Sequence, residues 1–388
     1  MASVNRLCVG HLVNEAWRPG ASYLAHICSN SSANLKHAVF CNRYSGEISG
    51  ERQNIYSREF SQSVRQMLSR RLSSSVGAYI DNMLTEYLWK RFLEKFRPGI
   101  IHAQDGKQTI QWLPFLEKTE LPLVVTFHGS DINSATFNVE HHRGLRRVFD
   151  RADHLHFVSK ALMRHAISIG APPEKSSVIY LGTPEAKPTE YSNRTHDCVF
   201  GIAANLVACK GHEVLLNAFK LVSKRLRNPE LHIWGDGPLK SRLHWLTEEL
   251  GLSGRVVFHG HMPHSDVQHM MRTGTDIILQ PSRRDDQGSE EGLPLSICEA
   301  SAAGIPCIAS DCGGISELIT HNVTGCLVPQ GHVEQLADSM LNLALNPDER
   351  RRLGFAALQK VQTRFSAREQ MSVIANLYID LCEKRTAA

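Results

Sequence analysis

The sequence has no uninterrupted apolar run of about 18 residues, the length that a membrane-spanning helix requires. Its first residues, MASVNRLCVGHLVNEAW, also lack the basic start, the continuous apolar core and the small-residue cleavage site of a signal peptide. Neither sign of charge is in large excess. Lys and Arg number 43 against 39 Asp and Glu, and no basic tract occurs, which argues against a nucleic-acid partner. We therefore expect a cytoplasmic protein. Its composition is still compatible with a small anionic ligand.

The motifs of several common chemistries are also missing. The ten cysteines include no Cys-X-X-Cys pair and lie mostly in apolar runs, which predicts reduced, buried thiols. No G-x-G-x-x-G opens either half of the chain, which argues against a dinucleotide-dependent dehydrogenase. The histidines of FHGHMPHSDVQH lack the i, i+4 spacing of a helical zinc motif, and the adjacent Asp285 and Asp286 are typical of a solvated loop. We therefore expect no metal.

Apolar runs alternate with helical patterns along the whole chain. Because the runs are continuously hydrophobic, they predict strands of parallel sheets that are covered by helices on both faces. The rhythm stops at a polar stretch with prolines and then restarts, which predicts two doubly wound α/β domains at 1–183 and 198–366, joined by a linker at 184–197. A helix at about 367–388 is expected to pack back on the first domain. The expected strands are 6–12, 35–42, 99–104, 121–129, 154–159, 177–182, 198–206, 231–235, 255–260, 276–280, 305–310 and 325–329.

One stretch does not fit this alternation. Around residues 56–72, apolar and basic side chains recur at helical spacing, with Tyr56, Phe60 and Val64 in the apolar stripe. A basic amphipathic helix of this kind is suited to contact with an anionic membrane surface, which would place the protein at the inner face of the membrane. The alternative is an ordinary helix that covers the first sheet.

Two acids eight residues apart, Glu291 and Glu299, lie on either side of a helix start. Pro294 suits the first helical position, and it leaves the N–H groups of Leu295 and Ser296 free at the positive end of the helix, where phosphate binds. Glu299 shares a face with Leu295 and lies about 6 Å further along the axis, within reach of ribose hydroxyls. Glu291 precedes the helix and projects towards whatever is attached beyond the phosphate. Because open parallel sheets bind ligands at their carboxyl edges, we expect a nucleoside diphosphate carrying a sugar in the cleft between the domains.

A metal-free diphosphate site still needs a cation. Lys210 precedes Gly211 directly after the expected strand 198–206, so its ammonium can point into the cleft while the glycine lets the backbone come close. One charge-assisted contact of this kind is worth about 1.5–3 kcal/mol, and it gains in value when the diphosphate departs with extra negative charge. The alternative is a solvated surface lysine.

These motifs together resemble a known family. Six of them occur in order over about residues 198–350, as they do in the C-terminal domain of retaining glycosyltransferase family 4, which has the GT-B fold. They are NLVACKGHEVLLNAF, LHIWGDGPLKSRL, VVFHGHMPHSDV, PSRRDD, EGLPLSICE and GIPCIASDCGGISELITHNVTGCLV. The first half is similar more loosely, through RPGASYLAHIC, RPGIIHAQ and VVTFHGSDI. Within the family the chain is most similar to bacterial exopolysaccharide enzymes of the colanic-acid and amylovoran type, and a heterocyst-envelope polysaccharide glycosyltransferase is a narrower candidate.

The resemblance implies two Rossmann-like domains, the first binding the acceptor and the second binding a UDP-sugar donor, with glucose as the leading sugar. Lys210 would hold the diphosphate, Glu299 the ribose hydroxyls, and Glu291 the transferred sugar and the charge that develops at its anomeric carbon. His128 would lie beside the donor sugar, with a structural histidine as the alternative, and Gly20 would let the first loop approach the phosphates. The other donor-binding residues that it implies are Asn205, His261, Met262, Gly292, Leu293, Leu295 and Ser296.

The chain departs from the family pattern at one point. It has Ala204-Asn205 where the family usually has Gly-Arg, so the positive charge of that arginine is missing. Either Asn205 donates a hydrogen bond in its place, or an arginine from elsewhere moves in. The candidates for the second case are Arg18, Arg283 and Arg284.

The reaction that the resemblance implies is a metal-independent front-face substitution with retention, in which the departing diphosphate helps to deprotonate a glycan or lipid-linked acceptor. A double displacement with Glu291 as the nucleophile is the alternative mechanism. Two other functions also stay open. One is a non-catalytic protein that binds a nucleotide sugar or a glycan, and the other is a sugar-nucleotide epimerase or hydrolase on the same fold.

Overall fold

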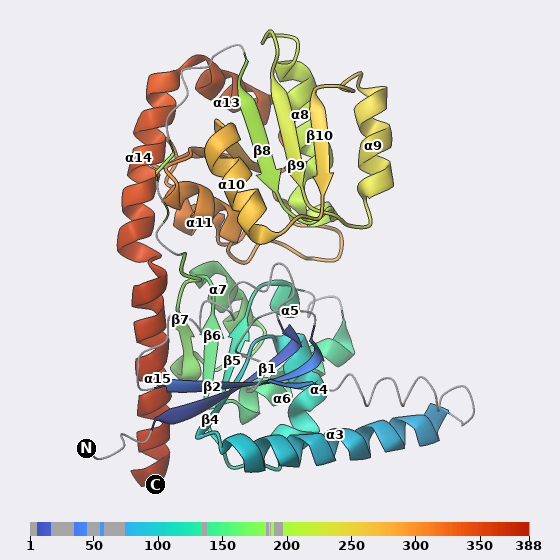
Figure 1. Ribbon diagram of the computed structural model, residues 1–388, viewed down its shortest axis with the longest axis vertical. Helices are drawn as coiled ribbons and strands as arrows, with labels where there is room; N and C mark the ends of the chain where they lie inside the picture. Colours follow the sequence, from blue (N-terminus) through green and yellow to red (C-terminus); the bar gives the residue numbers. More distant parts are fainter. Residues whose placement is uncertain are drawn as a thin grey trace. The chain divides into compact units, whose positions relative to one another are not determined.

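The computed structural model describes residues 6–16, 35–44, 55–57, 74–133, 138–183, 186, 188–189 and 197–387. The chain divides into two compact units. The N-terminal unit comprises Met1–Phe157, His165–Ile179 and Met371–Ala388, and the C-terminal unit comprises Val158–Arg164 and Tyr180–Gln370. Each unit is built around one parallel sheet with helices packed against it (Figure 1). The predicted domain boundaries at residues 183 and 198 stay a prediction.

The N-terminal unit contains a seven-stranded sheet in the order β3-β2-β1-β4-β5-β6-β7, with every neighbouring pair parallel. The order reverses between β1 and β4, which is the pattern of a doubly wound sheet. The strands are β1 (Leu7–Ala16), β2 (Leu35–Tyr44), β3 (Ile55–Ser57), β4 (Ile100–Ala103), β5 (Leu123–Phe127), β6 (His154–Phe157) and β7 (Ser176–Val178). The helices are α3 (Ser74–Phe96), α4 (Gly106–Leu116), α5 (Ser130–Asn133), α6 (Val139–Arg151), α7 (Lys160–Ser168), which begins in the C-terminal unit, and α15 (Ala367–Ala387).

The C-terminal unit contains a six-stranded parallel sheet in the order β10-β9-β8-β11-β12-β13, which reverses between β8 and β11. The strands are β8 (Val199–Ala203), β9 (Glu230–Trp234), β10 (Val256–Gly260), β11 (Ile277–Gln280), β12 (Cys307–Ser310) and β13 (Cys326–Val328). The helices are α8 (His212–Val222), α9 (Lys240–Glu249), α10 (His264–Gly274), α11 (Leu295–Ala302), α12 (Ile315–Leu318), α13 (Val333–Leu345) and α14 (Pro347–Arg364).

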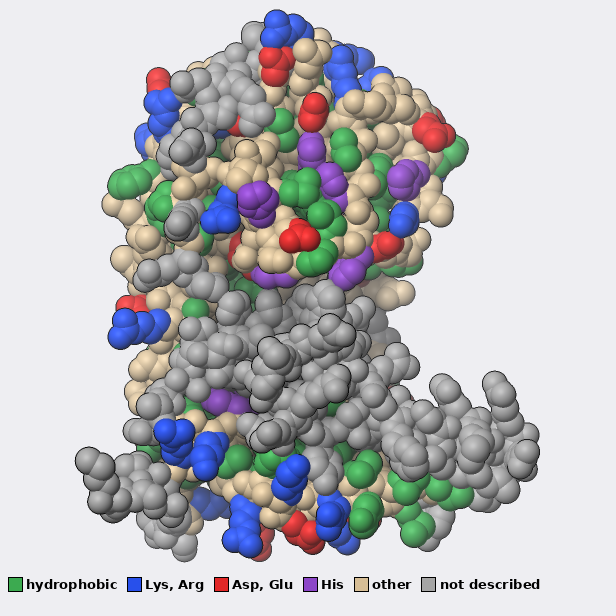
Figure 2. Space-filling view, viewed as in Figure 1, with side chains coloured by type: hydrophobic (Ala, Val, Ile, Leu, Met, Phe, Trp, Pro, Cys, Tyr) green, Lys and Arg blue, Asp and Glu red, His purple; other side chains and the backbone are tan. Residues whose placement is uncertain are grey.

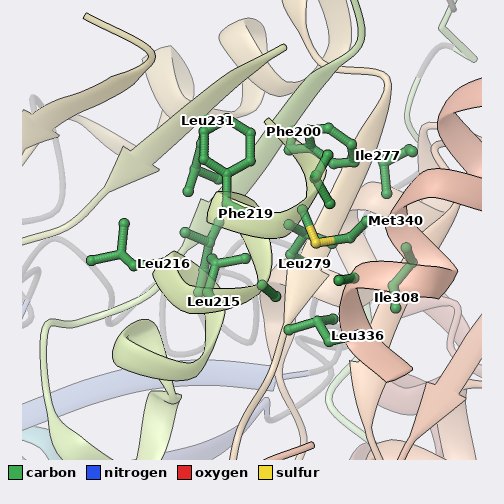
Figure 3. Close-up of a cluster of buried hydrophobic side chains, with 14 of the residues drawn as sticks. Phe200, Leu215, Leu216, Phe219, Leu231, Ile277, Leu279, Ile308, Leu336 and Met340 are labelled. Carbon is green, nitrogen blue, oxygen red and sulfur yellow. The ribbon is translucent and has the colours of Figure 1, made fainter. Parts of the chain in front are cut away.

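The core of the C-terminal unit lies between its sheet and the helices α8 and α13. Figure 3 shows Phe219 of α8 and Met340 of α13 among apolar side chains of the strands, including Phe200 of β8 and Leu279 of β11. All four side chains are fully buried. Burial of a large apolar side chain contributes about 1.5–3 kcal/mol, so this layer gives the loops at the sheet edge a rigid support.

All twelve expected strands are present, and each is parallel to its neighbours, because continuous apolar runs are stable only where helices cover both faces. The three-residue strand β3, which pairs with β2, was not among the strands predicted from the sequence. Tyr56 and Ser57 lie in that strand, so a helix beginning at Tyr56 is wrong there, and residues 58–73 lie outside the described part of the chain. In the described residues, no helix is both long enough and apolar enough to cross a membrane.

Helix α15 packs on the N-terminal unit, as expected. The hydroxyl of Tyr378 lies 2.5 Å from Nδ1 of His102 in β4, and Arg385 lies 3.5 Å from the carboxylate of Asp153. Tyr378 is only 1% exposed, so its ring belongs to the core of that unit. The carboxyl-terminal helix is therefore an integral part of the first sheet's packing.

Gly211, in the loop after β8, can be compared with Gly254, which lies between α9 and β10 and serves as the reference position. Gly211 has φ of 70°, and a Cβ there would lie 1.9 Å from the carbonyl oxygen of Pro281. Gly254 has φ of 85°, but no described atom lies within 4 Å of a Cβ at that position. We expect Gly254→Ala to cost about 1 kcal/mol for its left-handed backbone, and Gly211→Ala to cost at least about 2 kcal/mol more because of the collision. Urea unfolding of the two variants measures the difference, and equal losses would contradict the close approach.

Candidate functional site

Lys210 and Glu291 meet at the carboxyl edge of the C-terminal sheet. Lys210 ends the short turn that follows β8, and Glu291 lies in the loop between β11 and α11. The Nζ atom of Lys210 lies 2.8 Å from Oε1 and 2.7 Å from Oε2 of Glu291, and the two side chains are 22% and 8% exposed. Since β8 and β11 flank the point where the strand order reverses, this pair lies where open α/β sheets bind their ligands.

The surroundings of Lys210 favour its protonated form. Burial alone would lower the pKa of Lys210, but the charge of Glu291 and the hydrogen bonds to it outweigh burial, so this pKa lies above its ordinary value. The ammonium therefore remains protonated at neutral pH. A diphosphate that enters this site meets a cation whose charge is already balanced by one carboxylate.

Two further polar residues surround Glu291, and the sequence analysis did not assign them. Ser282 donates to Oε2 of Glu291 at 2.9 Å, and Nε2 of Gln280 approaches the same oxygen at 3.3 Å. Gln280 in turn donates to Ser282 at 2.8 Å and accepts from Ser296 at 3.2 Å. Their place directly at the end of the expected strand 276–280 was the available signal, because side chains at the carboxyl ends of strands line the ligand edge.

Helix α11 begins one residue later than expected. Pro294 precedes the helix instead of occupying its first turn, and the first backbone bond back to it comes from Ile297 at 3.2 Å. The N–H groups of Leu295 and Ser296 therefore stand at the amino end of the helix, as the sequence indicated. The loop before them is tightly held, because the N–H of Gly314 donates to the carbonyl of Glu291 at 3.3 Å.

Glu299 is paired with His264, one of the histidines weighed above as metal ligands. Nε2 of His264, at the start of α10, lies 2.9 Å from Oε1 of Glu299, and the two side chains are 36% and 10% exposed. The Glu299 carboxylate, as hydrogen-bond acceptor and as charge, raises the pKa of His264. In the described residues, no group of three or more His, Cys, Asp or Glu side chains could hold a metal ion. Histidine side chains are visible on this face of the C-terminal unit (Figure 2), where α10 lies in front of the sheet.

The pairing of His264 with Glu299 makes a prediction. In Glu299→Gln the histidine loses its anionic neighbour, so its pKa should fall towards the ordinary value near 6.5. The same change should weaken nucleotide binding about tenfold or more, since a hydrogen bond to a charged group is worth about 1.5–3 kcal/mol. An NMR titration of the His264 ring and calorimetric binding of UDP check the two parts. A histidine pKa that does not move would contradict the pairing.

The remaining predicted donor-binding residues lie at the same edge or just beyond it. Asn205 is exposed directly after β8, and His261 and Met262 follow the end of β10. Gly292 and Leu293 are buried in the loop before α11. The backbone N–H groups of Arg283 and Arg284 donate to the carbonyl of Cys209 and to the side chain of Gln330, so both arginines belong to the loop after β11. Gly20 and Arg18 lie outside the described residues.

In the N-terminal unit, His128 follows β5 and stands beside a buried carboxylate. Asp131 accepts hydrogen bonds from the backbone N–H groups of Gly106, His128, Gly129 and Ile132 at 2.9 to 3.2 Å. Burial lowers the pKa of His128, against the opposing charge of Asp131. Burial and the charge of Asp131 raise the pKa of Asp105, the N-cap residue of α4, to about 7. His128 is therefore a neutral imidazole at the carboxyl edge of its own sheet.

A row of buried histidines crosses the N-terminal sheet, and the sequence analysis did not foresee it. Tyr378 lies 2.5 Å from Nδ1 of His102, whose Nε2 lies 2.6 Å from the Thr126 hydroxyl. That hydroxyl lies 2.8 Å from Nδ1 of His156, whose Nε2 donates to the carbonyl of Ile179 at 2.7 Å. With both imidazoles neutral, which burial favours, the donors point in one direction along this row, from the Tyr378 hydroxyl to the Ile179 carbonyl, which only accepts. Burial accordingly lowers the pKa of His102 well below its ordinary value and that of His156 to about 3.

Two family models and several known proteins match the chain. Residues 22–187 match the family model described as Glycosyltransferase Family 4, and residues 185–360 match the model described as Glycosyl transferases group 1. The amylovoran biosynthesis glycosyltransferase AmsK of Erwinia amylovora is 30% identical over 63% of this chain and 60% of its own length. The putative colanic acid biosynthesis glycosyltransferase WcaL of Salmonella typhimurium is 28% identical over 64% of this chain and 60% of its own length. The chain thus aligns with 60% of the length of each of these relatives.

Solved structures share the fold over nearly the whole chain. HepE from Anabaena, in complex with UDP and glucose, has a TM-score of 0.76 at 19% identity and covers 97% of this chain and 100% of its own. Sucrose-phosphate synthase from Thermosynechococcus elongatus has a TM-score of 0.77 at 16% identity and covers 97% and 99%. At these identities the likeness shows the fold alone, so a heterocyst-envelope enzyme stays a prediction. The two family models match adjoining segments that together span residues 22–360, so the chain combines a Glycosyltransferase Family 4 domain with a Glycosyl transferases group 1 domain, on the GT-B fold.

Proposed function

We propose that this protein is a retaining glycosyltransferase that moves a hexose, with glucose as the leading sugar, from a UDP-sugar to a glycan or lipid-linked acceptor in exopolysaccharide assembly. The observation that supports it most is the meeting of Lys210 and Glu291 at the reversal point of the C-terminal sheet. The amylovoran and colanic acid relatives support the exopolysaccharide setting. The UDP bound to HepE supports the choice of nucleotide.

The proposal gives each element of the C-terminal site one task. The ammonium of Lys210 and the N–H groups of Leu295 and Ser296 bind the diphosphate, because both supply positive potential. Glu299, held by His264, accepts the ribose hydroxyls. The remaining assignments follow the family resemblance: the uracil lies against His261 and Met262, Asn205 donates to the diphosphate, and Gly20 and His128 serve the donor from the first domain.

The chemistry that fits this arrangement is a front-face substitution without a metal. As the bond from the anomeric carbon to the diphosphate breaks, negative charge grows on the phosphate oxygens, and the ammonium and the helix end stabilise it. Glu291 stabilises the positive charge on the sugar ring and binds one of its hydroxyls. The departing phosphate takes the proton of the acceptor hydroxyl, and that oxygen bonds to the same face of the anomeric carbon.

Purified protein incubated with a panel of nucleotide sugars tests the proposal. UDP-glucose, other UDP-sugars and GDP-mannose are each supplied with and without membrane glycolipid and with and without EDTA. We expect UDP release that depends on the glycolipid, is unaffected by EDTA, and yields a product with the donor's anomeric configuration by NMR. Release without acceptor would instead indicate a hydrolase, and binding without turnover would indicate a non-catalytic protein. Loss of activity with EDTA would overturn the metal-free mechanism.

A further inference from the structure

The two oxygens of the Glu291 carboxylate have different surroundings. Oε2 is approached by Lys210 at 2.7 Å, by Ser282 at 2.9 Å and by Gln280 at 3.3 Å. In the described part of the chain, Oε1 receives only Lys210, at 2.8 Å. A carboxylate oxygen accepts about two hydrogen bonds, so Oε2 is saturated while Oε1 keeps room for a donor from a ligand.

The two residues on Oε2 are held far more firmly than the lysine. Gln280 and Ser282 are 1% and 0% exposed, and Gln280 is the last residue of β11 in the centre of the sheet. The orientation of the Gln280 amide follows from its partners, because a carboxylate only accepts and the nitrogen must face Glu291. Its oxygen then accepts from Ser296 at 3.2 Å, at the start of α11. The side chain of Lys210 is 22% exposed, and its ammonium lies at the end of a flexible four-carbon stem.

We propose that Gln280 and Ser282 are positioning residues that anchor Glu291 through Oε2, so that Oε1 is presented to a hydroxyl of the donor sugar when Lys210 turns to the diphosphate. The inference rests on the proposed function and deepens it, because it names what selects the sugar part of the donor. The anchoring hydrogen bonds survive the arrival of the nucleotide, whereas the lysine contact is exchanged. Loss of the anchor should therefore affect recognition of the sugar and leave recognition of the nucleotide intact.

The test compares UDP with UDP-glucose in calorimetric titrations of Ser282→Ala and Gln280→Met. We expect the affinity for UDP to stay within about twofold of the wild type and the affinity for UDP-glucose to fall about tenfold, the size of one lost hydrogen bond to a charged group. In kinetic assays kcat should fall by a larger factor than KM for the donor rises, because the carboxylate matters most as charge develops on the sugar ring. Ser289→Ala, the same change in the same loop but outside this network, is the matched control and should behave as the wild type.

A second comparison separates positioning from general structural support. In a Glu291→Ala background, Ser282→Ala should cause no further loss of UDP-glucose affinity, since the residue acts through that carboxylate. Three outcomes would each overturn this inference but not the proposed function. They are equal losses of affinity for UDP and UDP-glucose, an additional loss in the Glu291→Ala background, and unchanged UDP-glucose binding by both variants. A wild-type protein that binds none of the nucleotide sugars in the panel would overturn the proposed function as well.

Discussion

Replacing Lys210 by Met should lower the rate of sugar transfer about 100-fold to 1,000-fold and destabilise the C-terminal unit by about 2 kcal/mol. The kinetic loss follows because the ammonium is the side-chain cation that the proposal assigns to the departing diphosphate. The loss of stability follows because Glu291, whose side chain is 8% exposed, loses the ammonium that is its ion-pair partner. Initial rates of UDP release and urea unfolding measure the two effects.

A surface lysine provides the matched control. Lys240, the first residue of α9, lies 3.0 Å from Asp236 in the loop before that helix, and both side chains are nearly half exposed, at 49% and 45%. Solvent and salt screen such a pair, so Lys240→Met should change stability by less than about 1 kcal/mol and leave transfer unaffected. Equal loss of stability in the two variants would contradict the special burial of the Lys210 pair.

A double variant separates charge burial from catalysis. Lys210→Met combined with Glu291→Gln removes both charges, so most of the lost stability should return while transfer stays at the level of the single variant or below. Recovery of activity together with stability would mean that the lysine serves only the fold. That outcome would remove the main support for the proposed diphosphate site.

Acidification from pH 7.0 to 5.5 should destabilise the N-terminal unit by about 4–5 kcal/mol. His11, His102 and His156 are 0% exposed, and burial lowers the pKa of each in the folded protein, that of His156 to about 3. In the unfolded chain the pKa returns to about 6.5, so the unfolded state takes up protons first as the pH falls. Their contribution is full above pH 6.5 and is lost below it, at about 1.4 kcal/mol per residue for each pH unit.

Other groups modify the sum. The carboxyl group of Asp105, with its pKa raised to about 7, binds a proton in the folded state over the same range and offsets about 1.5 kcal/mol of the roughly 4 kcal/mol from the three histidines. Burial lowers the pKa of His37 and His154 to about 4, and both add to the loss. Urea unfolding at the two pH values measures the net effect, which is a large part of the 5–15 kcal/mol typical of a folded protein.

Variants locate the effect within the histidine row. His156→Gln removes one group that must stay neutral, so the difference between the two pH values should shrink by about 1 kcal/mol whatever the variant's absolute stability. His269→Gln, at an exposed position of α10, should leave the difference unchanged. A difference that is the same in both variants and in the wild type would show that the buried histidines do not govern acid sensitivity.

The architecture was largely readable from the sequence. Twelve strands, the parallel pairing, and the position of α15 followed from continuous apolar runs and helical periodicity, since local pattern and burial on both faces are coupled. The short strand β3 escaped because three residues carry too little pattern to separate a strand from a helix. Pro294 was placed one position too far inside α11, because proline suits both the residue before a helix and its first turn.

The sequence by itself determined which residue types a donor site could use, namely a lysine before a glycine and two acids around a helix start. Only the tertiary structure decided that Lys210 is already paired with Glu291, that Gln280 and Ser282 hold that carboxylate, and that Glu299 faces His264. The physical reason is that these partners lie 9 to 81 positions apart along the chain or on different elements. Their distances depend on how parallel strands and helices pack, and no local spacing encodes that.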